Sequence, residues 1–255
     1  MNIGIQPYTM SALDEPLPSK LGRLARAGFE GVELGTDANT EAVREALAEH
    51  ELGVASIASG LEDLDEDLDA HVDASEAFET DKVVVMWIGP EEFETRADVA
   101  AVATRLDAEA DRLADHGLQL HYHNHAHEFT DLGETTGFEA LVEATDTVKF
   151  EIDVGWAGVG GVDPADLLDD IGERVTLVHA KDIRFGSGEF CTFGEGDLDV
   201  GGVVTAARRN EVDWLLWEND EPIDPVAEPS HASLLLDEHT GHLGRTATAT
   251  DSEHD

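Results

Sequence analysis

Eight short runs rich in aliphatic and β-branched residues recur along the chain, and longer amphipathic segments separate them. A short apolar run has the length of a buried strand, whereas apolar residues at helical spacing indicate a helix that covers a core. This alternation favours parallel strands joined by crossover helices. The predicted strands cover residues 2–6, 31–34, 54–57, 82–88, 118–123, 148–153, 175–179 and 214–218.

Helical segments follow the first seven strands, and no composition break or Ser/Gly linker divides the series. Eight strand–helix units in roughly 240 residues match the size of a (β/α)₈ TIM barrel, while a doubly wound sheet normally stops at about five to seven strands. We therefore predict an α/β fold, a single-domain TIM barrel over residues 1–240. The predicted helices cover residues 19–28, 40–50, 67–79, 96–117, 137–145, 163–172 and 201–210.

The last unit departs from this regularity. The eighth helix is expected within residues 224–239, where Pro229 interrupts the helical pattern, so we predict a shortened eighth unit. Residues 241–255 are mostly small, polar and acidic, and this composition predicts a disordered acidic tail.

The charge balance restricts the partners of the protein. The 57 acidic and 15 basic residues give a formal net charge of −42, so the surface repels phosphate backbones and anionic membranes. Repulsion of this size strains a fold at ordinary ionic strength, but at molar salt the Debye length shrinks to roughly 3 Å. We therefore predict a halophilic protein that binds neither nucleic acid nor membrane, in preference to an acidic binding protein.

Targeting and redox signals are sparse. Cys191 is the single cysteine, which excludes an internal disulfide. The opening MNIGIQPY has no basic residue and no long apolar run, and no later segment has the roughly 18 apolar residues of a membrane span. These features predict a cytoplasmic protein, and they leave a homo-oligomer possible.

Strand parity predicts which polar side chains face the barrel interior. Leu118, Leu120 and Tyr122 share one face of the fifth strand, which suits the helix layer, so His121 and His123 face inward. His125 and His127 follow the strand and are expected in a loop. By the same alternation, the inward residues of the last three strands are Lys149, Glu151, Asp153, His179, Lys181 and Glu218.

Each of the last four strands thus ends in an ionisable residue, at the rim where barrel active sites are built. Isolated charges are expensive to bury, and converging carboxylates and imidazoles suit a divalent cation, which accepts N and O ligands. The alternative for any one of these residues is a hydrogen-bonded core position. Four successive strand ends favour a metal site.

Several motifs, in this order, resemble those of the xylose isomerase-like barrels, the sugar phosphate isomerase/epimerase superfamily. They are IGIQPYT, GFEGVEL, YHNHAHEF, DVGWAGVGGVDP, VHAKD, FGEGDLDVGGV and WLLWEND, and together they span about residues 2 to 225. The resemblance implies the same barrel fold that the strand count predicts.

The resemblance also implies a single divalent ion, Mn²⁺, Mg²⁺, Zn²⁺ or Co²⁺, with ligands from strands five to eight. Carried over to this chain, the implied ligands are Asp153, His179 and Glu218, with either His123 or Glu128 from strand five. Members of the superfamily include epimerases and dehydratases that act on carbohydrate-like substrates, and this implies a small molecule of that class as the substrate here.

The implied chemistry is proton transfer next to a carbonyl, through an enediolate. We predict an isomerase or epimerase of a sugar, sugar phosphate or cyclitol. The alternatives are a dehydratase, or lyase, of a keto-sugar, cyclitol or dehydroshikimate-like substrate, and a non-catalytic carbohydrate-binding barrel. Glu128 and Glu218 are the candidates for proton transfer. The other predicted substrate contacts are Lys181, which could hold an enediolate oxygen, His125, and the stacking residues Trp87 and Trp156.

Overall fold

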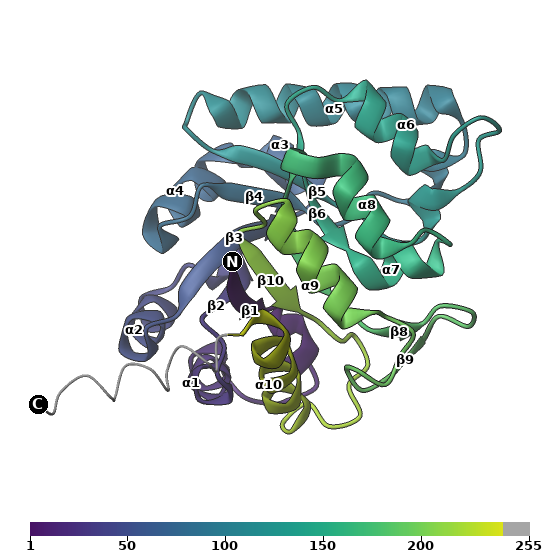
Figure 1. Ribbon diagram of the computed structural model, residues 1–255. Coiled ribbons are helices and arrows are strands. Elements are labelled where there is room, and N and C mark those ends of the chain that lie inside the picture. Colours follow the sequence, from purple (N-terminus) through teal and green to yellow (C-terminus); the bar gives the residue numbers. More distant parts are fainter. Residues whose placement is uncertain (242–255) are drawn as a thin grey trace, which may run out of the picture.

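The computed structural model describes residues 1–241 and shows a closed barrel of eight parallel strands (Figure 1). The strands follow one another around the barrel in the order β1-β10-β7-β6-β5-β4-β3-β2, and all eight predicted strands are confirmed. Their bounds are β1 Asn2–Ile5, β2 Gly31–Gly35, β3 Gly53–Ser59, β4 Lys82–Val85, β5 Gln119–His123, β6 Lys149–Asp153, β7 Val175–Ala180 and β10 Trp214–Trp217.

Helices form the outer layer, and one long helix follows each strand, the first seven as predicted. Side-chain caps fix several helix starts; Thr136, for example, forms a reciprocal capping box with Glu139. The long helices are α1 Leu17–Ala27, α2 Glu41–His50, α4 Leu68–Phe78, α5 Arg96–Ala114, α6 Gly137–Ala144, α8 Pro164–Ile171, α9 Val200–Arg209 and α10 Glu228–Thr240.

Short elements on the loops lie at the carboxyl ends of the strands. Helix α3 (Leu61–Glu66) follows β3, helix α7 (Val154–Val159) follows β6, and the antiparallel pair β8 (Ile183–Arg184) and β9 (Glu189–Phe190) follows β7. The Asp182 carboxylate orders the loop after this pair by accepting hydrogen bonds from the backbone N–H groups of Gly194, Gly196 and Leu198.

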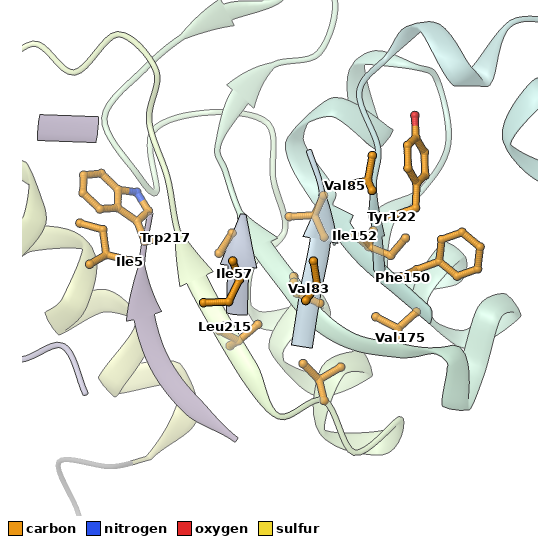
Figure 2. Packing of buried hydrophobic residues seen from close by; sticks show 14 of the residues in the cluster. Ile5, Ile57, Val83, Val85, Tyr122, Phe150, Ile152, Val175, Leu215 and Trp217 are labelled. Atoms are coloured by element: carbon orange, nitrogen blue, oxygen red, sulfur yellow. The ribbon is translucent and has the colours of Figure 1, made fainter. Parts of the chain in front are cut away.

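The main core lies between the barrel and the helices. Outward-facing strand residues such as Val83, Tyr122, Phe150 and Trp217 are buried there (Figure 2). The barrel interior holds a separate small cluster of Ala55, Val84, Leu177 and Leu216, with Met86 and Trp214 packed against it. The interior position of Leu177 and Leu216 agrees with the predicted inward faces of strands β7 and β10.

Glycines make room for Trp214 at the amino end of the barrel. A Cβ at Gly31 would lie 2.5 Å from the Trp214 ring, and one at Gly4 would lie 3.2 Å from it. The indole therefore fills the space that three neighbouring strands leave empty, and this end of the barrel is packed rather than open.

The prediction of a shortened eighth unit is wrong. Helix α10 has 13 residues, and Pro229 lies in its first turn. A first-turn proline is tolerated because its missing N–H has no partner within the helix there, so Pro229 begins the helix instead of interrupting it. Gly241 ends the helix in the left-handed conformation. The rest of the predicted tail, residues 242–255, lies outside the described residues.

No helix within residues 1–241 is both long enough and apolar enough to span a membrane.

Candidate metal-binding active site

Three predicted ligand residues meet at the carboxyl ends of β5, β6 and β7. One side-chain ligand atom from each of His123, Asp153 and His179 lies within 4.8 Å of the others, and all three residues are buried. We call this set the rim group. A second set, Glu33, Glu151 and His179, shares the histidine.

Both histidines are held by a carboxylate at one ring nitrogen. Nδ1 of His123 lies 3.0 Å from Oε2 of Glu151, and Nδ1 of His179 lies 3.1 Å from Oε2 of Glu218. Outer partners of this kind orient metal-binding imidazoles and fix their tautomer. On His123 this leaves Nε2 facing the rim group, 3.8 Å from Oδ2 of Asp153.

Asp153 is fixed by the start of helix α7. Its Oδ1 accepts a hydrogen bond of 2.8 Å from the Trp156 backbone N–H, and the Asn124 side chain bonds both its backbone N–H and its carbonyl. The other carboxylate oxygen, Oδ2, is buried, makes no hydrogen bond and lies 3.2 Å from Nζ of Lys181. The N-cap therefore orients Asp153 so that one oxygen faces the rim group.

Lys181 supplies the positive charge beside this set. Its Nζ lies 2.9 Å from Oε2 of Glu218 and 3.2 Å from Oδ2 of both Asp153 and Asp220. Burial acts to lower the pKa of Lys181, but these three carboxylates outweigh it and hold the pKa above its usual range. The ammonium is therefore charged and engaged on three sides.

Burial also perturbs the acids. It raises the pKa of Asp153 to about 6 and, with the neighbouring Glu33, raises the pKa of Glu151 to about 8. Glu218 behaves differently, because Lys181 and His179 outweigh its burial and lower its pKa. The site thus contains more carboxylates than Lys181 and His179 can neutralise. The excess negative charge and the burial together raise the pKa values of Glu151 and Asp153.

These residues fit a divalent cation. Oε1 of Glu151 is buried without a hydrogen bond, which is costly for a group of this polarity. Oδ2 of Asp153 and Nε2 of His179 also make no hydrogen bond, and their ion-pair partners lie at 3.2 Å (Lys181) and 3.3 Å (Glu33 and Glu151). Burial and the neighbouring imidazole of His179 lower the pKa of His123, so its ring is neutral and can donate a lone pair. Mixed N and O donors suit Zn²⁺, Mn²⁺ or Co²⁺.

Glu128 lies in the turn after β5 and is not part of the rim group. It accepts hydrogen bonds from the Tyr122 hydroxyl at 2.7 Å and from the His125 backbone N–H at 2.9 Å. Burial raises its pKa to about 7. Tyr122 belongs to the outer core, so the Glu128 carboxylate is held on the side of the helix layer.

The predicted substrate-contact residues surround the rim group. The His125 ring lies 5.1 Å from that of His123 and 4.5 Å from that of Trp87, which is 52% exposed. Trp156 lies on the other side of His125, with the Lys181 ammonium 5.2 Å above its ring. His121 faces inward as predicted, but its Nε2 is 2.7 Å from the Thr176 hydroxyl, so it is a hydrogen-bonded core residue.

Two residues at the site were not predicted. Oε2 of Glu33, on β2, lies 3.3 Å from Nε2 of His179, and its carboxylate also contacts Gln6 and Ser56. Asp220, which pairs with Lys181, lies beyond β10. A single acid inside the apolar strand GVELG was a usable signal for Glu33, whereas a loop position such as Asp220 offered none.

Fold and site define a class: a parallel (β/α)₈ barrel whose carboxyl rim gathers carboxylates and imidazoles suited to a divalent ion. Residues 21–235 match the model of the xylose isomerase-like TIM barrel family. The chain belongs to this family, which confirms the resemblance of its motifs.

The chain spans about half the length of the curated relatives that it matches. Inosose dehydratase from Geobacillus kaustophilus (strain HTA426) is 30% identical over 150 residues, which is 50% of this chain and 47% of that protein. Inosose dehydratase from Lacticaseibacillus casei is 26% identical over 154 residues, which is 52% of this chain and 50% of that protein.

Solved structures share the fold over nearly the whole chain. A sugar phosphate isomerase/epimerase from Parabacteroides distasonis ATCC 8503 has a TM-score of 0.77 at 19% identity, covering 94% of each chain. The 3-keto-D-glucoside 4-epimerase from E. coli has a TM-score of 0.69 at 16% identity, covering 93% of this chain and 99% of that chain. At these identities the likeness shows the fold alone.

Proposed function

We propose that this protein is a divalent-metal-dependent isomerase or epimerase of a small carbohydrate-like substrate, acting by proton transfer next to a carbonyl. The observation that carries the proposal is the rim group, in which His123, Asp153 and His179 each have one atom held by the protein and another facing a shared point. His123 is the strand-five ligand in this proposal, because Glu128 is engaged by Tyr122.

The bound ion would supply Lewis-acid polarisation of a substrate carbonyl and hydroxyl, which acidifies the C–H bond beside them. Glu218 is the candidate for accepting the proton from carbon, because its carboxylate lies beside His179 and Lys181 at the rim. The Lys181 ammonium, 2.9 Å away, can stabilise the oxygen on which negative charge develops. Return of the proton to the neighbouring carbon gives isomerisation, and its return to the opposite face gives epimerisation.

A dehydratase is the second candidate, because both curated relatives described above are named inosose dehydratase. The first chemical step is the same in this case, and loss of a β-hydroxyl replaces return of the proton. Substrate that takes up deuterium from D₂O without loss of water supports the isomerase or epimerase, and release of water supports the dehydratase.

The test is metal analysis of protein purified in molar KCl, followed by a screen of ketoses, cyclitols and keto-acids with and without Mn²⁺, Mg²⁺, Zn²⁺ or Co²⁺. We expect turnover that a chelator abolishes and that Glu218→Gln lowers by roughly 10²–10⁴-fold. Asp169→Asn, at a surface pair with Arg209, is the matched carboxylate control. Carbohydrate binding that survives both the chelator and Glu218→Gln, without turnover, would identify a non-catalytic barrel.

A further inference from the structure

A cavity of about 640 Å³ opens at the carboxyl ends of β2, β3 and β4 and against α3 and α4. Its volume lies in the range of about 300–1,000 Å³ that is usual for small-molecule pockets. Trp87 lines the cavity, and its ring also contacts that of His125, which contacts that of His123. Two ring contacts therefore separate the cavity wall from the rim group.

Ser59 and His71 form a fixed polar pair in this wall. Oγ of Ser59 lies 2.7 Å from Nε2 of His71, and Nδ1 of His71 lies 2.8 Å from the Asp67 carbonyl oxygen. Because a carbonyl can only accept, Nδ1 of His71 carries a proton, and the Ser59 hydroxyl donates to the Gly60 carbonyl oxygen at 2.9 Å. The Ser59 oxygen keeps lone pairs that can accept a hydrogen bond from a ligand hydroxyl.

The charged part of the wall consists of acceptors alone. Asp37, Asp63, Glu66 and Asp67 line the cavity, and none of its lining residues, all in the described part of the chain, is Lys or Arg. Carboxylates accept hydrogen bonds from hydroxyl groups and repel anions. Lys181, the cation beside the rim group, is not among the residues that line the cavity.

We propose that this cavity binds the hydroxyl-bearing end of an uncharged polyol or keto-sugar, with Trp87 against its C–H face, and that it discriminates against phosphorylated sugars. The inference rests on the proposed function for the placement of the carbonyl end at the rim group. Binding of hydroxyl groups in the cavity stands on the Ser59–His71 pair, the carboxylates and the exposed indole.

The test is equilibrium binding in molar KCl to the metal-loaded Glu218→Gln protein, which is chosen to suppress turnover. The probes are two matched pairs, D-fructose with D-fructose 6-phosphate and myo-inositol with its 1-phosphate. We expect at least one neutral probe to bind at least about tenfold more tightly than its phosphorylated partner, and Trp87→Ala to weaken that binding about fivefold. Trp87 is half-exposed, so its removal leaves the core intact.

A charge reversal gives the sharper test. Glu66→Lys should tighten binding of the phosphorylated probes by about tenfold, whereas Glu76→Lys, an exposed position on α4 outside the cavity, should leave it unchanged. Equal effects of the two reversals, equal affinity for both members of each pair, or no binding of either neutral probe would overturn the inference. If the protein turns over a substrate but shows no preference for the neutral probes, only the inference about the cavity fails. If it prefers the neutral probes but turns over no substrate, only the proposed function fails.

Discussion

The carboxyl rim of the barrel has two halves with different chemistry. At or next to the ends of strands β5, β6, β7 and β10 lie His123, Asp153, His179 and Glu218, which are buried and ionisable; the first three form the rim group, and Glu218 bonds His179. Strands β2, β3 and β4 end instead near Gly35, Ser59 and Trp87, beside an open cavity. Under the proposed function and the inference above, the first half, which we call the reactive half, holds the reacting groups, and the second, the recognition half, binds the rest of the substrate.

Glu33 is the exception that connects the halves. It belongs to β2, yet its carboxylate reaches across the barrel to His179, and Ser56 on β3 holds its other oxygen at 2.5 Å. A β-bulge between β2 and β3, where the register shifts after Val32, accompanies this placement. A residue of the recognition half therefore contacts His179 of the reactive half.

The same carboxylate-to-amide change in each half gives the largest contrast. We expect Asp153→Asn to abolish metal binding and to lower kcat/KM by roughly 10²–10⁴-fold, because it removes a ligand facing the rim group. Asp37→Asn should lower kcat/KM by only about fivefold, through KM, since it weakens one hydrogen bond worth about 1 kcal/mol. Steady-state kinetics and metal analysis measure both, and effects of equal size would contradict the division.

A second pair of variants tests which residue of strand five belongs to the reactive half. His123→Gln should weaken metal affinity by at least about tenfold, whereas Glu128→Gln should leave it unchanged, because Glu128 is bonded to Tyr122. Titration of chelator-treated protein with Zn²⁺ or Mn²⁺ measures the two affinities. The opposite order would make Glu128 the ligand.

Glu128 also predicts a pH dependence of stability. Burial raises its pKa in the folded protein to about 7, above the ordinary 4.5. Between these two pKa values the carboxyl of Glu128 is ionised in the unfolded chain but still protonated in the folded protein. Glu128 therefore contributes on the order of 3 kcal/mol to the free energy of unfolding below pH 4.5, and this contribution is lost as the pH rises through 7. In molar KCl, the melting temperature of Glu128→Gln should fall less steeply over this pH range than that of the unchanged protein. An identical pH dependence of the two melting temperatures would refute the assignment.

The smallest expected effect concerns the link between the halves. Ser56→Ala removes the hydroxyl that bonds Glu33 and should lower the free energy of unfolding by about 1–2 kcal/mol, with only a slight loss of metal affinity. Denaturant unfolding measures the first quantity and metal titration the second. A metal affinity as low as that of Asp153→Asn would show that the two halves are not separable.

Strand alternation is a local property, and for this reason the sequence predicted the barrel and most of the polar side chains that face its interior. A pleated strand sends successive side chains to opposite faces, so the inward position of His123, Asp153 and His179 follows from their neighbours in the chain. Pro229 shows the limit of such patterns, because the effect of a proline depends on where the helix begins. The sequence predicts a helix within residues 224–239, but α10 begins at Glu228, so Pro229 lies in its first turn.

The sequence by itself determined which residues face inward; only the tertiary structure decided which of them meet. Whether Glu33 reaches His179 depends on the stagger and register of strands far apart in the chain. The path of the turn after β5 places the Glu128 carboxylate within hydrogen-bond distance of the Tyr122 hydroxyl. Asp220 reaches Lys181 from a loop whose conformation no periodic pattern encodes. Contacts across a barrel are set by closure of the whole sheet, and closure is not a property of any one segment.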